Sequence, residues 1–256
     1  HRGSISSPFF SFMPLFPHMT RLITVLLAAS TDATRLHRVR PSDGSLTAFA
    51  ASIADRAINH DIHLARAPAS GTPARSLRVI AMRVPLGHGR ACWRRARRRL
   101  LSWEMHEGST WSAVLVEDPP GRSLVTLAAL PSPRLPLLWV SNPCRAVRRR
   151  VGRRRSSVGY STLSGHLLEG EEKMDVVWSR ETDEVAFEVV SHSRGAGPLG
   201  KLLFPALSST QRRFFREQCR CMQRAAAGVQ RVEPVWSSPR SAHPGHRLEA
   251  VAGVTR

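Results

Sequence analysis

The spacing of hydrophobic positions from residue 76 onward predicts a strand followed by a helix. The mostly apolar segment Ser76–Val84 is strand-like, and Pro85 and Gly87 close it. Along Arg90–Trp103 the apolar residues recur every three or four positions, and arginines occupy most of the rest. That spacing places one apolar stripe on a helix. The residues of the stripe are Trp93, Ala96, Leu100 and Trp103.

A run of short strand-like segments follows, and turn residues separate them. Pro119-Pro120-Gly121, Asn142-Pro143 and Gly152 mark three of these turns. Spacings this short favour antiparallel neighbours, because a parallel crossover needs a dozen or more residues. The expected strands are Thr110–Asp118, Arg122–Leu130, Pro136–Val140, Cys144–Val151, Ser156–Leu163, Glu172–Trp178 and Glu184–Ser193.

The last expected element is a long amphipathic helix from about Leu199 to Ala226. Pro205 should kink this helix or mark its start, while Arg212, Arg216 and Arg220 form a charged stripe. Because the apolar face of a sheet needs a cover, this helix should lie against it. The order of elements predicts an α+β fold of the helix-grip kind, a curved antiparallel sheet wrapped around a long C-terminal helix. The other side of the helix carries Leu207, Thr210, Phe214, Cys221 and Ala225.

The two ends of the chain differ in composition from this middle part. Residues 1–76 are rich in Ser, Ala, Pro and Arg, and the segment from Met19 has a basic residue, a short apolar run and then small residues. This composition is typical of a targeting segment or of disorder. We expect a disordered or targeting leader over 1–76, an α+β domain over 77–227 and a disordered tail over 228–256. The protein should be intracellular, with a plastid or mitochondrion as its destination if the leader is a transit peptide.

The formal net charge of +19 comes almost entirely from arginine, with lysine only at Lys173 and Lys201. Abundant Arg, Ala, Gly and Pro beside scarce Lys is typical of GC-rich coding, so the charge alone is weak evidence for an anionic partner. The densest basic patch, Arg148–Arg155, could contact an anionic membrane surface. It lacks the aromatic residues that stack on bases, which disfavours a nucleic acid. The sequence carries no signal for an oligomeric state.

Cysteine and histidine patterns give no metal or cofactor site. The cysteines are too few and too irregularly spaced for a disulfide framework or a zinc site, so we expect reduced, buried thiols. His106 lies just past the first helix between two glutamates, where a charged histidine would favour the helix C-terminus. The four cysteines are Cys92, Cys144, Cys219 and Cys221.

The segment from Ser164 to Gly170 holds candidate chemistry in a glycine-bounded turn. Gly165 and Gly170 permit backbone angles that other residues resist, so they could position His166 and Glu169. The two side chains could act as a base and an acid, or as two metal ligands, although a metal site would need at least one more ligand. The competing interpretation is that His166 pins the turn through hydrogen bonds. We favour the structural role, with catalysis as the alternative.

Glu172 follows this turn on a strand with period-two alternation. It shares a face with Met174 and Trp178, whereas Lys173 faces the other way. An acid on an apolar face is costly unless it is paired or wet. It could bind the polar head of a ligand, or it could pair with an arginine such as Arg145 or Arg194. Glu188 on the next strand poses the same choice, and ion pairing is the favoured interpretation of both.

The motif GYSTLSGHLLEGEE carries a resemblance to a known family. Its glycines, Tyr160, Thr162, Leu163, His166, Glu171 and Glu172 match the signature of the DUF1990 family, which groups uncharacterised proteins of bacteria, plants and algae. Further similar pieces, in the family's order, are LLSWEMHEG, NPCRAV and FEVVSHSR. Together they cover about Leu77–Ala226, with departures at Ser161, His192 and Gly195. The resemblance implies a fold like the START/Bet v 1-type lipid-binding domains and implies no agreed activity.

These observations favour a domain that binds a small apolar or amphipathic ligand, such as a lipid, without catalysis or a cofactor. One alternative is a hydrolase- or isomerase-type enzyme that uses His166 with Glu169 or Glu172. Another is a protein associated with an organelle envelope. The residues expected to contact the ligand are Tyr160, Thr162, His166, Glu171, Glu172, Trp178 and Glu188.

Overall fold

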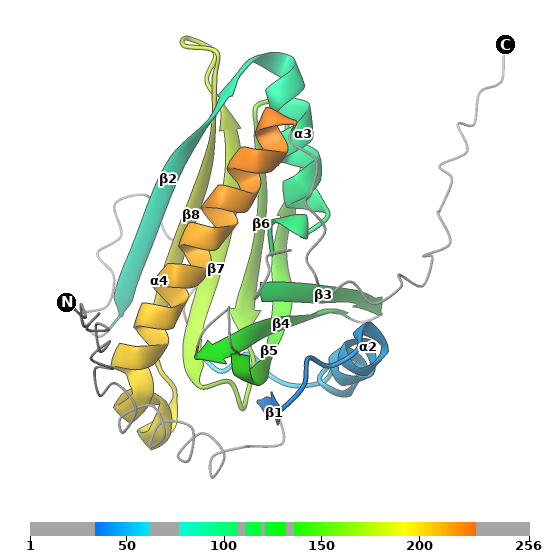
Figure 1. Ribbon diagram of the computed structural model, residues 1–256, viewed down its shortest axis with the longest axis vertical. Helices are drawn as coiled ribbons and strands as arrows, with labels where there is room; N and C mark the ends of the chain where they lie inside the picture. Colours follow the sequence, from blue (N-terminus) through cyan, green and yellow to red (C-terminus); the bar gives the residue numbers. More distant parts are fainter. Residues whose placement is uncertain (1–33, 62–76, 107–110, 119–120, 132–135, 229–256) are drawn as a thin grey trace, which may run out of the picture.

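The computed structural model describes residues 34–61, 77–106, 111–118, 121–131 and 136–228. They form a curved antiparallel sheet of eight strands with a long helix across its concave face (Figure 1). The strands are β1 (Arg35–His37), β2 (Arg78–His88), β3 (Trp111–Asp118), β4 (Gly121–Pro131), β5 (Pro136–Arg150), β6 (Arg155–Thr162), β7 (Leu168–Trp178) and β8 (Glu184–Gly195). The helices are α2 (Asp43–Ser52), α3 (Gly89–Leu101), the 3-10 turn η1 (Glu104–His106) and α4 (Gly197–Ala227).

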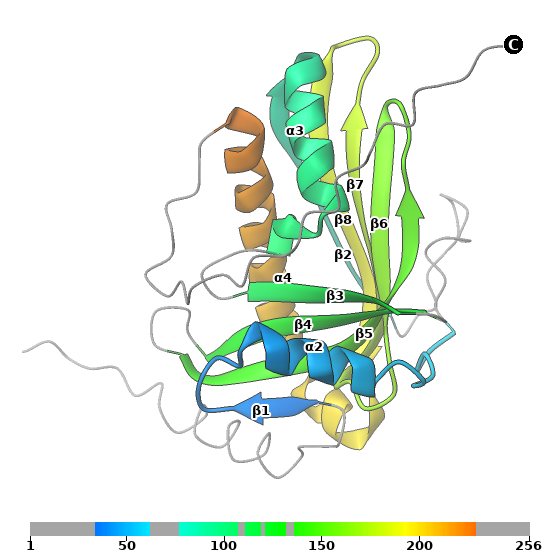
Figure 2. The same cartoon turned by 90° about the vertical axis from the view of Figure 1, so that its right-hand side faces the viewer.

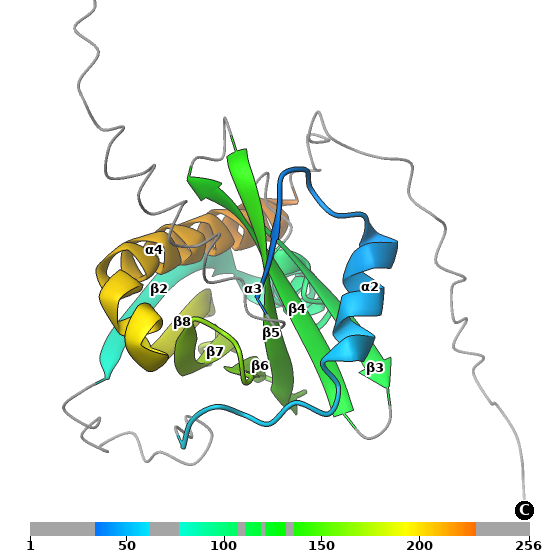
Figure 3. The ribbon, with the colours of Figure 1, turned by 90° about the horizontal axis from the view of Figure 1, so that it is seen from below.

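Strand order confirms the predicted helix-grip architecture. The sheet runs β2-β8-β7-β6-β5-β4-β3, and β1 adds to β5. Every pair is antiparallel. Seen from below, the sheet curves around the lower part of α4 (Figure 3). Alternate residues of the central strands, such as Met174, Val176, Phe187 and Val189, point inward and are fully buried.

Helix α4 covers the concave face with its apolar side. Phe214, Phe215 and Met222 are buried, while the stripe of Arg212, Arg216 and Arg220 is exposed, as the spacing predicts. Pro205 lies inside the helix, and Pro198 occupies its first turn, where a missing N–H removes no helical hydrogen bond. Proline in the interior therefore did not end the helix, and Pro198, not Pro205, marks its start.

Helix α3 fills the other end of the concave side (Figure 2). Its predicted apolar face is buried, and Trp93 stacks on Trp178 with ring centroids 6.1 Å apart. The expectation that His106 carries a charge at the helix end is wrong. His106 is 1% exposed. Burial lowers its pKa to about 4, so the ring is neutral at pH 7.

Two predicted strand ends are corrected by the pairing. β2 continues past Pro85 and Gly87 to His88, with an irregular register between the proline and the glycine. β5 runs through Asn142-Pro143 as one strand. Along one edge it pairs with β1 up to Ser141 and with β6 from Cys144 onward. Pro143 therefore sits in the gap between two ladders, where its missing N–H is tolerated.

Residues 34–61 fold, which corrects the expectation that all of 1–76 is a leader. The side chain of Ser42 caps α2, and this helix packs on the outer side of the sheet. Leu46, Phe49, Ala50 and Ile53 of α2 form a second core with Val125, Leu127 and Leu163. β4 is thus buried on both faces. The predicted targeting segment and tail lie outside the described residues, as does 62–76.

Candidate functional site

A cavity of about 100 Å³ lies between the middle of α4 and the sheet. Its walls come from β4 through β8, the turn between β6 and β7, and α4. Leu207 and Phe214 close it from the helix side, and Ala128 and Val140 from the sheet. The polar side chains at its walls are Thr126, Asn142, Tyr160, Thr162, His166, Glu172, Ser191, Ser193, Thr210 and Gln211.

The turn between β6 and β7 brings His166 to this cavity. Gly165 has a φ of 90°, a left-handed conformation that favours glycine. The backbone N–H of Leu168 donates to Nδ1 of His166 over 2.8 Å, so the histidine does pin the turn. Because Nδ1 accepts this bond, the proton of the neutral ring resides on Nε2. Burial, and secondarily His60, lowers the pKa of His166 and favours that neutral ring.

Residues from the N-terminal segment 34–61 form hydrogen bonds to the same turn and to the strand ends beside it. The hydroxyl of Thr34 donates to the carbonyl of Gly165 over 2.8 Å. Asn59 reaches both sides of the turn, because Nδ2 donates to the carbonyl of Leu168 over 3.1 Å and Oδ1 accepts from the hydroxyl of Thr162 over 2.6 Å. Segment 34–61, which sequence reasoning assigned to a leader, therefore helps to build the site.

Gly170 is required by close packing of β7 against β8. A Cβ added there would lie 2.4 Å from the carbonyl oxygen of His192 and 2.9 Å from the Cβ of Ser193. Its N–H donates to the hydroxyl of Thr162 over 2.9 Å. Gly170, the third glycine of the motif, is therefore needed for close packing at the cavity wall and has no positive φ.

Glu172 is the acid of the cavity, and no cation among the described residues compensates it. It is 7% exposed. The Tyr160 hydroxyl donates to Oε2, and Nε2 of Gln211 donates to Oε1 over 2.8 Å. Burial raises the pKa of Glu172 to about 7, although these hydrogen bonds and one with Ser191 oppose the rise. Burial and the negative charge of Glu172 also raise the pKa of Tyr160.

The predicted pairing of Glu172 with an arginine is wrong, because both candidates are engaged elsewhere. Arg145 donates to the carbonyls of Ala54 and Arg56, each over 2.7 Å. Arg194 donates to Glu169 over 2.6 Å. Glu169 is thereby held in an ion pair and does not line the cavity, so Glu172 remains as the acid that shares the cavity with His166.

Of the seven residues predicted to contact the ligand, four line the cavity and three do not. Glu171 lies between two residues of β7 that line the cavity, so its side chain faces the other side. Trp178 is at the far end of the core, and its Nε1 donates to Asp183 over 2.7 Å. Glu188 faces outward, where it pairs with Arg155. The four that line the cavity are Tyr160, Thr162, His166 and Glu172.

Sequence reasoning missed Gln211 and the two serines of β8. Gln211 bonds Glu172 and also donates to the hydroxyl of Ser191 over 3.0 Å, while Ser193 donates to its Oε1 over 3.2 Å. One signal was available in the sequence. Gln211 is a polar residue within the apolar stripe of α4, between Leu207 and Phe214. A buried amide in such a stripe needs partners on the facing sheet.

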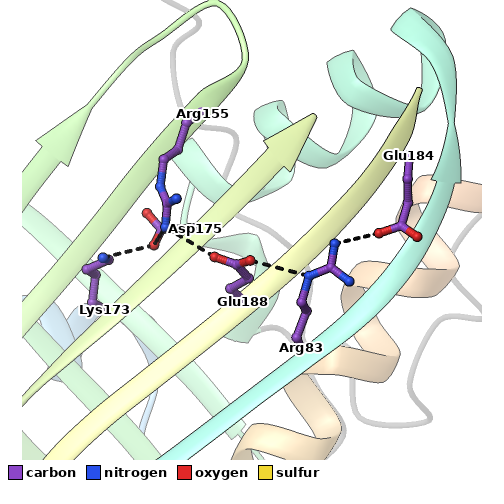
Figure 4. A network of polar contacts seen from close by, with 6 residues as sticks. All are labelled: Arg83, Arg155, Lys173, Asp175, Glu184 and Glu188. Carbon is purple, nitrogen blue, oxygen red and sulfur yellow. Dashed lines mark hydrogen bonds and ion pairs between the residues drawn. The ribbon is translucent and has the colours of Figure 1, made fainter. Parts of the chain in front are cut away.

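The outer face of the sheet carries an ionic network instead (Figure 4). Arg155 lies 2.7 Å from Asp175 and 3.1 Å from Glu188. Arg83 lies 3.4 Å from Glu188, and Lys173 lies 3.2 Å from Asp175. The predicted structural ion pairing of Glu188 is therefore confirmed, and Glu188 does not line the cavity.

The basic patch Arg148–Arg155 forms the hairpin between β5 and β6. Several of its arginines have intramolecular partners. Arg149 donates to the carbonyl of Leu101, and Arg154 lies over the ring of Trp178, 4.5 Å from its centroid. Its contact with an anionic membrane stays a prediction. Within the described ranges no three His, Cys, Asp or Glu side chains gather as metal ligands, and no helix has the length and apolar character of a membrane span.

The fold and the cavity together define a helix-grip domain in which a cluster of polar side chains lies in a mostly apolar cavity. The chain belongs to the family described as a domain of unknown function (DUF1990), whose model matches residues 62–221. A UPF0548 protein of Deinococcus radiodurans is 31% identical over 164 residues, which cover 56% of this chain and 76% of that protein. A UPF0548 protein of Arabidopsis thaliana is 33% identical over 147 residues, covering 52% and 66%.

Solved structures of similar fold share little sequence with this chain. A hypothetical protein of Helicobacter pylori has 10% identity and a TM-score of 0.44, covering 64% of this chain and 95% of that one. The ZhuI aromatase/cyclase of Streptomyces sp. R1128 has 12% identity and a TM-score of 0.44, covering 61% and 97%. The norcoclaurine synthase of Thalictrum flavum has 10% identity and a TM-score of 0.40, covering 59% and 95%.

Proposed function

We propose that this domain binds a small amphipathic ligand between the sheet and α4, with the polar end of the ligand at Glu172. The observation that carries the proposal is a nearly buried carboxyl at the wall of a mostly apolar cavity, with neutral hydrogen-bond donors and, among the described residues, no cation around it. Ligand-binding sites orient their ligands through a few polar groups in an otherwise apolar pocket.

The chemistry of the cluster favours a hydrogen-bond donor as the polar end. The two carboxylate oxygens can accept more bonds than the ones they receive from Tyr160, Gln211 and Ser191. An ammonium or hydroxyl group would use this remaining capacity, and an ammonium would also supply the missing positive charge. A carboxylate would place a second negative charge beside Glu172 in a low-dielectric site, which is unfavourable once Glu172 is ionised.

Three eight-carbon probes with one apolar chain and different polar ends test this proposal. The full-length protein is titrated by calorimetry at pH 8 with octylamine, 1-octanol and octanoate. We expect octylamine to bind most tightly and octanoate most weakly, by about tenfold or more between the extremes. Glu172→Gln should remove the preference for the amine. Glu188→Gln, the same substitution on the outer face, should leave it unchanged. Absence of saturable binding by all three probes would contradict the proposal.

An acid–base enzyme is the second candidate, because His166 and Glu172 line the same cavity. With Nδ1 held by the Leu168 N–H, the Nε2–H of His166 could donate a hydrogen bond to a substrate, and Glu172 would be the group that accepts a proton. p-Nitrophenyl octanoate serves as a substrate for the hydrolase form of this hypothesis. Turnover should fall by about a hundredfold or more in His166→Gln. Turnover that is absent in the wild type, or equal in wild type and variant, excludes it for this ester.

A further inference from the structure

Behind the cavity lies a second group of buried polar atoms, and they have no partners among the described residues. Nε2 of His106 and both side-chain polar atoms of Gln218 make no hydrogen bond there. Each of the two side chains is 1% exposed. Buried polar groups in folded proteins are nearly always paired, and each exception requires an explanation.

The ring of His106 packs against two aromatic residues that line the cavity. Its ring lies 5.4 Å from that of Phe214 and 6.2 Å from that of Tyr160, measured between centroids. Nδ1 lies 3.3 Å from the carbonyl oxygen of Trp103. Because a carbonyl only accepts, the hydrogen of the neutral ring lies on Nδ1. Nε2 is therefore an acceptor and requires a donor.

Gln218 lies next to the same aromatic residue along α4. It follows Phe214 by four positions, so the two side chains lie one above the other on one face of the helix. Its amide offers one acceptor and two donors. A hydroxyl group lying between the two side chains would donate to Nε2 of His106 and accept from the amide of Gln218. A purely apolar group would leave all three atoms unpaired.

We propose that the ligand site extends past Phe214 to a second polar subsite formed by His106 and Gln218, which binds a hydroxyl group at the far end of the ligand. This inference rests on the proposed ligand-binding function and adds the chemistry of the second end. Gln211 and Gln218 are seven residues apart on α4, a rise of about 10 Å at 1.5 Å per residue. The ligand class is an elongated molecule with polar groups at both ends and an apolar middle. Phe214 lines the cavity and contacts the His106 ring, so the proposed site requires its side chain to rotate.

The two probes that test it are 1-octanol and 1,8-octanediol, which differ only by the second hydroxyl. Both are titrated into the full-length protein by calorimetry. We expect the diol to bind about tenfold more tightly, because it completes hydrogen bonds that the mono-alcohol leaves unmade. In Gln218→Met and in His106→Phe the ratio of the two dissociation constants should fall to about one. Gln223→Met, the same substitution at an exposed position of α4, should keep the tenfold ratio.

The outcomes separate the two proposals. If neither alcohol binds to the wild type, the ligand-binding function itself fails. If 1-octanol binds and the diol binds no more tightly, the subsite is overturned and the function stands. A ratio that survives Gln218→Met and His106→Phe also overturns the subsite, since the gain then arises elsewhere. Should either variant fail to fold, the ratio in the wild type still decides.

Discussion

Two acids on β7, three residues apart, have opposite surroundings. Glu172 faces the cavity and is held by neutral donors, and burial raises its pKa to about 7. Asp175 faces outward and is also buried, at 2% exposed. Hydrogen bonds from Arg155 and Ser157 and the charge of Lys173 outweigh its burial and lower its pKa.

This difference separates a structural acid from one available to a ligand. Asp175 has its counter-charges within the protein, so nothing further is required to stabilise its ionised form. Burial destabilises the ionised form of Glu172. A hydrogen-bond donor or a cation supplied by a ligand would reduce this destabilisation. Burial alone does not distinguish the two acids. The two acids differ in whether a cation lies beside them: among the described residues, Asp175 has neighbouring cations and Glu172 has none.

The largest expected effect is a pH-dependent destabilisation by Glu172 that Glu172→Gln removes. The pKa of Glu172 is about 7 in the folded protein, against an ordinary value of 4.5 for a glutamate in water. Between these values the folded state holds more protons, so the contribution of Glu172 to stability falls as pH rises from 4.5 to 7 and then levels off. The stability of the variant relative to the wild type should rise by up to about 3 kcal/mol between about pH 4.5 and 8. Urea denaturation at both pH values measures it, and parallel pH profiles would contradict it.

On the outer face, Arg155→Met should destabilise the domain by about 2 kcal/mol. Asp175 would remain buried with Lys173 as its nearest cation. The effect should lie between that of an exposed pair and that of a fully buried one, because the side chain of Arg155 is 47% exposed and that of Asp175 is 3% exposed. Because the lost interaction is an ion pair, added salt should reduce the difference in stability between variant and wild type, as measured by urea denaturation.

Arg153→Met is the matched control for this substitution. Arg153 is exposed in the same hairpin, and its removal should change stability by less than about 0.5 kcal/mol. If both variants lose the same stability, the hairpin depends on its overall positive charge, and the contrast between the faces of β7 is not the cause.

Much of this fold follows from periodicity, since alternation decides which side of a strand is buried. The inward face of β7 was predicted from Glu172, Met174 and their spacing, and the apolar face of α3 from three- and four-residue spacings. Glu188 was misplaced because its face depends on register. It pairs with Asp175, an outward residue, and no local pattern specifies that pairing.

The rest depends on contacts between distant segments. Gln211 meets Glu172 across 39 residues, and only the path of α4 over the sheet brings them together. Helix α2 was missed because Val125 and Leu127 look like the outward side of an ordinary strand until another element covers them. Neither contact has a signature in the local sequence.

The smallest expected effect concerns a neutral contact at the edge of the cavity, and it sharpens the contrast with the ionic outer face. Asn59→Ala removes bonds to the Thr162 hydroxyl and the Leu168 carbonyl, so the domain should lose about 1 kcal/mol in urea denaturation. Because both bonds are uncharged, the loss should stay the same in high salt, unlike that of Arg155→Met. Asp55→Ala, an exposed position of the same segment, is the control. A salt-sensitive loss at Asn59 would mean that charge also supports the inner face, and Glu172 would then be less isolated than its contacts indicate.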